Sequence, residues 1–145
     1  MDLRRVRPLA SHDLARIEAV CREAARRYES GRSTMTQFFD PEHPTKQQIK
    51  EYGLGARGRI GIDRWFIAQL RSLRPQRPGA RSWTLIVRLM IDIQQNNVRQ
   101  VRAGQDGHLT AFADAYGQTK GLHADLWELG RAAGFTGTSP CAAVV

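Results

Sequence analysis

Residues 83–102 read WTLIVRLMIDIQQNNVRQVR, and the architecture of the chain depends on the secondary structure of this segment. Apolar residues at every second position from Trp83 to Ile93 would suit a buried strand. Polar residues, however, recur every three or four positions, as they do on one side of a helix: Thr84, Arg88, Asp92, Gln95 and Arg99. Because this polar stripe continues to Arg102 without a turn signal, its length favours a central, largely buried helix over 83–102. A short strand at 83–93 is the alternative.

Apolar residues at helical spacing predict further helices on both sides of this segment. The expected ranges are 12–30, 45–52, 62–73, 108–116 and 120–133. Thr45 and Gln48 form a capping-box pattern, and Gly117 and Gly134 are expected to end the last two helices. Three glycines are expected to keep residues 54–61 irregular: Gly55, Gly58 and Gly61. The sequence therefore predicts a mainly α, compact single-domain bundle of about six helices over 1–145, with an N-terminal arm (1–11) and a C-terminal tail (136–145).

Aromatic side chains are expected to stabilise this bundle rather than to stack on bases. Trp65, Phe66 and Trp83 occupy apolar helical positions, where core packing is the usual role. Phe38 and Phe39 precede two Xaa-Pro pairs in a predicted loop. We expect them to fasten this loop to the bundle, and an exposed contact patch for a partner is the alternative.

Length and composition fit one ordinary globular domain of 145 residues with 41% hydrophobic residues. A chain of this size buries about 68–70% of its unfolded surface, so it needs no metal or disulfide to fold. No apolar run is long enough for a membrane span, and no apolar leader follows Met1, so a cytoplasmic location is expected. Cys21 and Cys141 lie 120 positions apart and are expected to be reduced thiols.

The net charge of +8 is concentrated in the middle of the chain. Residues 46–102 hold twelve Lys or Arg against three Asp or Glu, whereas 1–45 carry a net +1 and 103–145 a net −2. Such a basic segment is typical of proteins that bind a polyanion, with nucleic acid as the leading candidate. Nineteen of the 22 basic residues are arginine, which a GC-rich coding sequence would also produce.

The most informative local motif is Arg57-Gly58-Arg59 between two predicted helices. Two guanidinium groups around a glycine can enter a narrow A·T-rich minor groove. Residues 45–73 resemble the DNA-binding domain of the actinobacterial xenogeneic-silencer nucleoid proteins, in which an Arg-Gly-Arg-Ile loop joins two helices. The resemblance implies that Arg57 and Arg59 enter the groove. Gly61 stands where that family usually has proline, and no strand-rich dimerisation domain precedes the motif.

Two other DNA-binding motifs fit the same residues poorly. A helix-hairpin-helix needs two glycines separated by one residue, but Gly58 and Gly61 are three apart. A helix-turn-helix could use 45–52 and 62–73, but nine residues between these helices exceed its usual turn of about three to four.

Nothing in the sequence nominates a reaction. The four histidines are scattered, and the chain has no phosphate-binding Gly-Lys-Ser/Thr motif, no serine elbow and no cysteine–histidine pair. We therefore expect no enzymatic activity, no metal and no cofactor.

These observations together predict a small DNA-binding protein with an arginine-rich face, regulatory or nucleoid-associated, and duplex DNA is favoured over RNA. The alternative is a helical interaction module, an inhibitor or adaptor, that binds an acidic protein partner. The C-terminal helices could form a homodimer. The predicted nucleic-acid-binding residues are Arg57, Gly58, Arg59, Arg64, Arg71, Arg74, Arg77 and Arg81.

Overall fold

The computed structural model describes residues 5–30, 39–75 and 81–143. They form five α-helices and a 3-10 turn: α1 (Ser11–Ser30), α2 (Lys46–Ala56), α3 (Arg59–Ser72), α4 (Arg81–Asp106), α5 (Leu109–Ala133) and η2 (Pro140–Ala143). The predicted mainly α bundle is confirmed, and the strand considered for 83–93 is wrong, because these residues are helical.

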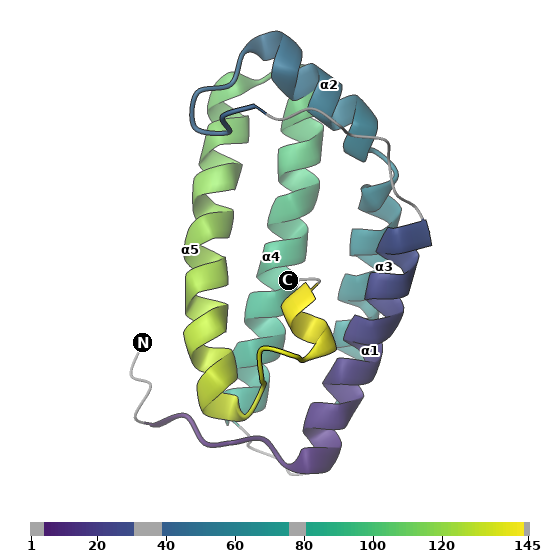
Figure 1. The fold of residues 1–145 in the computed structure, drawn as a ribbon, viewed down its shortest axis with the longest axis vertical. Helices are drawn as coiled ribbons and strands as arrows, with labels where there is room; N and C mark the ends of the chain where they lie inside the picture. The colour runs from purple at the N-terminus through teal and green to yellow at the C-terminus, as the bar shows by residue number, and fades with distance from the viewer. Residues whose placement is uncertain (1–4, 31–38, 76–80, 144–145) are drawn as a thin grey trace.

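Helix α4 is the centre of the bundle and contacts α2, α3 and α5 (Figure 1). Its buried side chains Ile86, Met90 and Ile93 face inward, and two of them join Phe66 and Leu70 of α3 in the main core. Helix α1 packs against α3 and η2, and α2 lies across the end of the bundle where α4 ends. Trp65, Phe66 and Trp83 all belong to or pack on this core, as expected.

A second, smaller core lies under α2. Phe112 of α5 is fully buried beside Ile49, and its ring centroid lies 5.3 Å from that of Tyr52. The ring of Phe39 lies 6.4 Å from that of Tyr52 and 6.2 Å from that of Phe112. The prediction that this loop is fastened to the bundle is therefore confirmed for Phe39, whereas Phe38 lies outside the described residues.

Two glycines allow α2 and α4 to touch. A Cβ atom added at Gly53 would lie 2.2 Å from the backbone nitrogen of Gln105, and one added at Gly104 would lie 2.5 Å from the carbonyl oxygen of Ile49. Both glycines are buried. Any side chain here would separate the two helices, so their contact depends on glycine.

The prediction that residues 54–61 are irregular is wrong. Helix α2 continues to Ala56 and α3 begins at Arg59, so only Arg57 and Gly58 join them. Gly58 has φ −67° and ψ −19°, which is ordinary right-handed backbone. Gly55 and Gly61 lie inside α2 and α3, because one glycine lowers helix stability by only about 1 kcal/mol, and Gly58 alone of the three stands in the turn. The nine-residue gap that counted against a helix-turn-helix is therefore a two-residue turn.

The expected break at Gly117 is also absent, because α5 is continuous from Leu109 to Ala133. Asn96 of α4 donates its amide hydrogens to the carbonyl oxygen of Ala115 and to Thr119 Oγ1, and this contact spans the expected break. Gly134 does end the helix, with φ +108°. None of the described helices combines the length and the apolar character needed to cross a membrane.

Cys21 and Cys141 form a disulfide, with an S–S distance of 2.08 Å, so the expectation of reduced thiols is wrong. The bond joins α1 to η2. Separation along the sequence misled the prediction, because the middle of α1 lies against η2 in space. The backbone nitrogen of Leu9 donates to the carbonyl oxygen of Ala133 at 2.9 Å, which holds the N-terminal arm against the end of α5.

Candidate nucleic-acid interface

Three arginines border one open groove between two helices. Arg71 lies in the last turn of α3, Arg74 lies two residues after that helix ends, and Arg88 lies on α4, which runs alongside α3 in the opposite direction. Six apolar residues line the groove with them, together with Thr84 and Gln95: Leu70, Leu73, Pro75, Trp83, Val87 and Ile91. The groove thus combines cationic side chains with a mixed apolar and polar lining, and Asp92 is the acidic side chain that lines it.

Helical periodicity extends this rim along both helices. Arg64 precedes Arg71 by seven residues and Arg81 precedes Arg88 by seven, and residues two turns apart share a face. All five arginines are exposed, and none forms an ion pair with a carboxylate among the described residues. We refer to this set as the basic face: Arg64, Arg71, Arg74, Arg81 and Arg88.

The last turn of α3 orders one of these side chains. The Arg74 guanidinium donates to the carbonyl oxygens of Arg71 at 2.6 Å and Leu73 at 2.8 Å. These acceptors carry the partial negative charge of a helix C-terminus, which favours a cation there. The guanidinium of Arg16 also donates to the carbonyl oxygen of Arg74, so α1 supports the same turn.

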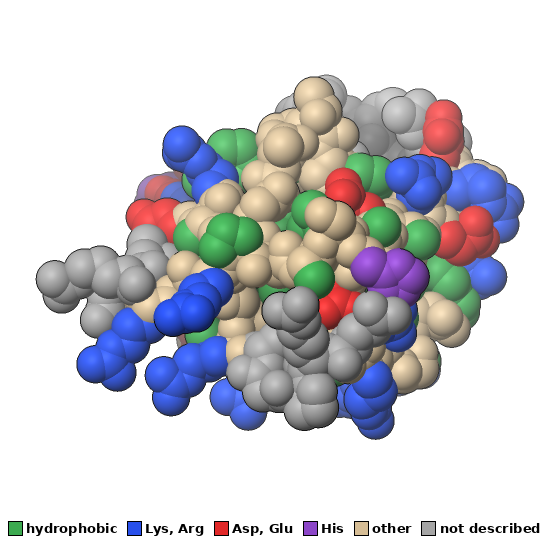
Figure 2. All heavy atoms as spheres, turned by 90° about the horizontal axis from the view of Figure 1, so that it is seen from below, with side chains coloured by type: hydrophobic (Ala, Val, Ile, Leu, Met, Phe, Trp, Pro, Cys, Tyr) green, Lys and Arg blue, Asp and Glu red, His purple; other side chains and the backbone are tan. Residues whose placement is uncertain are grey.

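One end of the bundle is rich in basic side chains. Figure 2 views the end where α1 and α4 begin. Lys and Arg side chains lie around much of its margin and are most numerous along the lower and lower-left edge, whereas those at the right lie beside acidic side chains. The backbone nitrogen of Arg7 donates to Ser82 Oγ at 3.1 Å, which places this exposed residue beside the start of α4. Sequence reasoning did not select Arg7 or Arg88. Arg88 had a signal, because it lies on the polar stripe of residues 83–102.

The Arg57-Gly58-Arg59 turn lies at the opposite end of α3 from Arg71 and Arg74. A helix rises about 1.5 Å per residue, so the two groups are about 20 Å apart. Arg57 and Arg59 are exposed, but the guanidinium carbon of Arg59 lies 5.4 Å from the ring centroid of Tyr28. The structure therefore places the two predicted groups of site residues at different ends of one helix. Arg77 lies outside the described residues.

Arg59 also acts on a buried acid. Asp63 is 1% exposed, the hydroxyl of Tyr28 donates to its Oδ1, and its Oδ2 has no hydrogen-bond partner among the described residues. Burial raises the pKa of Asp63 to about 6, although the hydrogen bond from Tyr28 and the charge of Arg59 oppose this. Burial and the charge of Asp63 together raise the pKa of Tyr28 well above its usual value. Arg59 therefore interacts with side chains inside the bundle, through its contact with Tyr28 and its charge near Asp63.

The remaining basic residues of 46–102 are spread more widely. Lys46 and Lys50 lie against Gly107 at the turn between α4 and α5. Arg99 lines a separate groove between these helices that also contains Asp92 and Asp125. The predicted convergence of positive charge is thus partial and is strongest on α3 and the first half of α4.

One group of side chains has the composition of a metal site. Asp40, Glu42 and His43 present ligand atoms within 4.8 Å of one another, and all three are exposed. Two of these side chains form a hydrogen bond with each other, since His43 Nδ1 lies 3.0 Å from Asp40 Oδ2. Glu42 accepts a hydrogen bond from Lys120 Nζ at 3.0 Å. These contacts account for the cluster as a surface network between the 39–45 loop and α5.

Comparison of the chain with protein-family models, with curated proteins and with solved structures finds no match. The resemblance of residues 45–73 to the silencer proteins therefore stays a prediction.

Proposed function

We propose that the chain is a DNA-binding protein that contacts duplex phosphates through the basic face. The observation that carries this proposal is the groove between α3 and α4, where Arg71, Arg74 and Arg88 come together without a carboxylate partner among the described residues. Arginine forms charge-assisted hydrogen bonds with phosphate oxygens, and such contacts supply most of the affinity in sequence-independent binding.

The exposed side of α3 supports a duplex as the ligand. Gly61 and Ala68 alternate with Arg64 and Arg71 along this stripe, and all four are exposed. Small residues between the arginines let the helix backbone approach the phosphate backbone closely. Single-stranded ligands are less well supported on this face, because Phe66 and Trp83 are buried and have no face free for base stacking, and the exposed Trp127 lies on α5 instead.

The experiment is a titration of labelled duplex DNA, single-stranded DNA and RNA at two salt concentrations. We expect duplex affinity to fall with salt at a logarithmic slope of about −0.9 per phosphate contact. The triple variant R71Q/R74Q/R88Q should make this slope less steep, by the amount that corresponds to about two to three lost phosphate contacts. R22Q, which changes an exposed arginine on α1, is the matched control. Absence of duplex binding by the wild-type protein at low salt would refute the proposal.

The predicted minor-groove role of Arg57 and Arg59 is tested separately in the same assay. If these residues enter an A·T-rich groove, R57A/R59A loses preference for A·T over G·C duplexes while the salt slope changes by about two contacts or less. Loss of affinity without loss of preference would assign the turn to phosphate binding alone.

The alternative, an interaction module for an acidic protein, is favoured by apolar residues of the same groove. Leu73, Val87 and Ile91 are partly exposed beside the arginines, which suits an amphipathic acidic helix. If an acidic amphipathic peptide binds to the protein and none of the nucleic acids does, this alternative function is supported. Size-exclusion chromatography of the same sample tests the predicted homodimer.

The DNA-binding proposal includes a cytoplasmic, nucleoid-associated location. The Cys21–Cys141 disulfide counts against it, because disulfides persist mainly in oxidising compartments. Because both cysteines are buried, cells are quenched with acid and the thiols alkylated in denaturant: alkylated cysteines indicate a reducing compartment, and unalkylated cysteines an oxidising one.

A further inference from the structure

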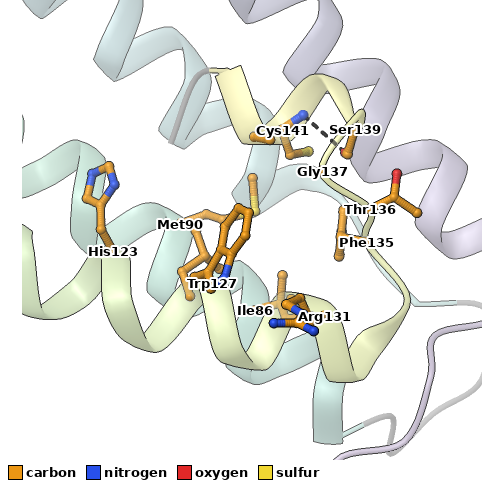
Figure 3. A pocket seen from close by; sticks show the side chains of 13 residues that line it. Ile86, Met90, His123, Trp127, Arg131, Phe135, Thr136, Gly137, Ser139 and Cys141 are labelled. Carbon is orange, nitrogen blue, oxygen red and sulfur yellow. Dashed lines mark hydrogen bonds between the residues drawn. The ribbon is translucent and has the colours of Figure 1, made fainter.

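A cavity of about 250 Å³ lies between α4, α5 and the segment that follows α5 (Figure 3). Its wall is mainly apolar, and Ile86 and Met90 of α4 line it together with Leu126 of α5 and Phe135. Cys141 also lines it, so the disulfide holds one wall in place. The cavity is separate from the α3–α4 groove, with which it shares no lining residue.

Glycine keeps part of this space open. Gly130 is buried on the side of α5 that lines the cavity, and a Cβ atom added there would first meet the side chain of Phe135, at 3.9 Å. Gly137 lines the cavity from the segment after α5. The absence of side chains at these positions leaves room for the body of a small molecule.

Three residues at four-residue intervals line the cavity from one side of α5: His123, Trp127 and Arg131 (Figure 3). Trp127 is 57% exposed, which is unusual for a large aromatic side chain. Arg131 is exposed and forms no ion pair with a described residue. Burial lowers the pKa of His123, which leaves its ring uncharged near neutral pH. Arg131 is thus the one charged side chain among the residues that line the cavity.

We propose that this cavity binds a small amphipathic carboxylate, with its apolar body between α4 and α5 and its carboxylate on Arg131. An apolar cavity with a few placed polar groups is typical of small-molecule sites. The guanidinium group recognises a carboxylate by paired hydrogen bonds, whereas it repels an amine. The indole of Trp127 lies one helical turn from Arg131 and can cover the apolar body of the ligand.

The test compares molecules of one size that differ in head group. Octanoate, octan-1-ol and octylamine are titrated calorimetrically into the full chain, and 3-phenylpropanoate tests an aryl body in place of an alkyl one. We expect one octanoate or phenylpropanoate per chain, bound about tenfold more tightly than octan-1-ol, because a charge-assisted hydrogen bond accounts for about this factor. Octylamine should bind more weakly than octan-1-ol.

Variants locate the head group. R131Q should reduce octanoate affinity to that of octan-1-ol without changing octan-1-ol binding, and R131K should retain part of the preference. R22Q, an exposed arginine on α1 that does not line the cavity, should behave as wild type. Equal affinities for octanoate and octan-1-ol in the wild-type protein, or an R131Q variant that keeps the preference, would overturn the proposal.

A second measurement locates the apolar body independently of folding defects in a variant. Nuclear Overhauser contacts between the octanoate chain and the accessible lining side chains Leu126, Trp127 and Phe135 are expected in the wild-type protein. Contacts with Leu73, Val87 or Ile91 instead would place the ligand in the α3–α4 groove and overturn the proposal. Neither result depends on DNA binding, so the two proposals fail or succeed separately.

Discussion

Gly53 of α2 and Gly104 of α4 bring the backbones of their helices into direct contact. A Cβ atom at Gly104 would lie 2.5 Å from Ile49 O and 3.1 Å from the backbone nitrogen of Gly53. We expect G53A and G104A each to lower the free energy of unfolding by about 2 kcal/mol, because overpacking costs about 1–3 kcal/mol and exceeds the helix propensity gained by alanine. Urea unfolding measures the change.

Gly61 provides the matched control for these variants. It also lies within a helix, but it is exposed and nothing lies within 4 Å of the position of its Cβ. We expect G61A to stabilise the protein by about 0.5–1 kcal/mol. Destabilisation of G61A equal to that of G53A would show that helix contact is not the cause.

Asp63 predicts a loss of stability as pH rises. Its pKa is raised by burial from 3.8 to about 6 in the folded chain, so its protonated form favours folding. The contribution is complete below pH 4 and is lost as pH rises through about 6, by up to about 3 kcal/mol for a shift of this size. The difference in unfolding free energy between wild type and D63N, measured from pH 4 to pH 7, should therefore fall as pH rises.

Glu23 is the control for this pH dependence, because its shift has the opposite sign. A hydrogen bond from Arg26 lowers the pKa of this exposed carboxyl to about 2. Its stabilising effect is complete above about pH 4.5 and is lost as pH falls from there through about 2. The difference between wild type and E23Q should stay level between pH 5 and pH 7, and a slope there like that of D63N would contradict the assignment to Asp63.

The disulfide predicts that stability depends on reductant. Joining Cys21 to Cys141 closes a loop of about 120 residues, and removal of that constraint from the unfolded chain costs about 3–5 kcal/mol. Wild-type protein should unfold at lower urea concentration after reduction, with a mass gain of about 2 Da. The C21S/C141S variant should unfold at the same urea concentration as the reduced wild-type protein, and reductant should not change that concentration. A wild-type transition that reductant leaves in place would contradict this prediction.

The two arginines of the α2–α3 turn should differ in their effect on stability. Arg59 lies over the ring of Tyr28 and opposes the rise in the pKa of Asp63, whereas the Arg57 side chain forms no ion pair or cation–π contact among the described residues. We expect R59A to destabilise the protein by about 0.5–1 kcal/mol and R57A by less than about 0.3 kcal/mol. Thermal unfolding of the two variants side by side checks this, and equal effects would argue against the Tyr28 contact.

Helix type and position were predictable where the apolar pattern was long, as for residues 83–102, which lie within α4. Helix ends were predicted less well because glycine alone was treated as a stop signal. Gly134 ends α5 with a left-handed backbone, whereas Gly117 is exposed, has no such φ and lies inside α5. Contacts of α5 with α4, such as Asn96 with Ala115, outweigh the low helix propensity of glycine, and they are not visible in the local sequence.

The candidate site was predictable in part for a similar reason. Positions seven apart on one helix share a face, so Arg64 with Arg71 and Arg81 with Arg88 could be grouped from spacing. The pairing of α3 with α4 could not, because spacing says nothing about which helices are neighbours. The cavity beside Trp127 was missed because its walls come from α4, α5 and the segment after α5, which no local pattern brings together.

The Cys21–Cys141 bond also decides how the chain would respond to mechanical tension. A force that pulls the chain from both sides of this bond would extend only the residues before Cys21 and those after Cys141, and would then pass through the sulfur atoms. The helices α2, α3, α4 and α5 lie between the bonded cysteines and would carry none of the load. A translocating motor that pulls from one end would therefore reach a covalently closed loop, which it cannot pass through as a single extended chain.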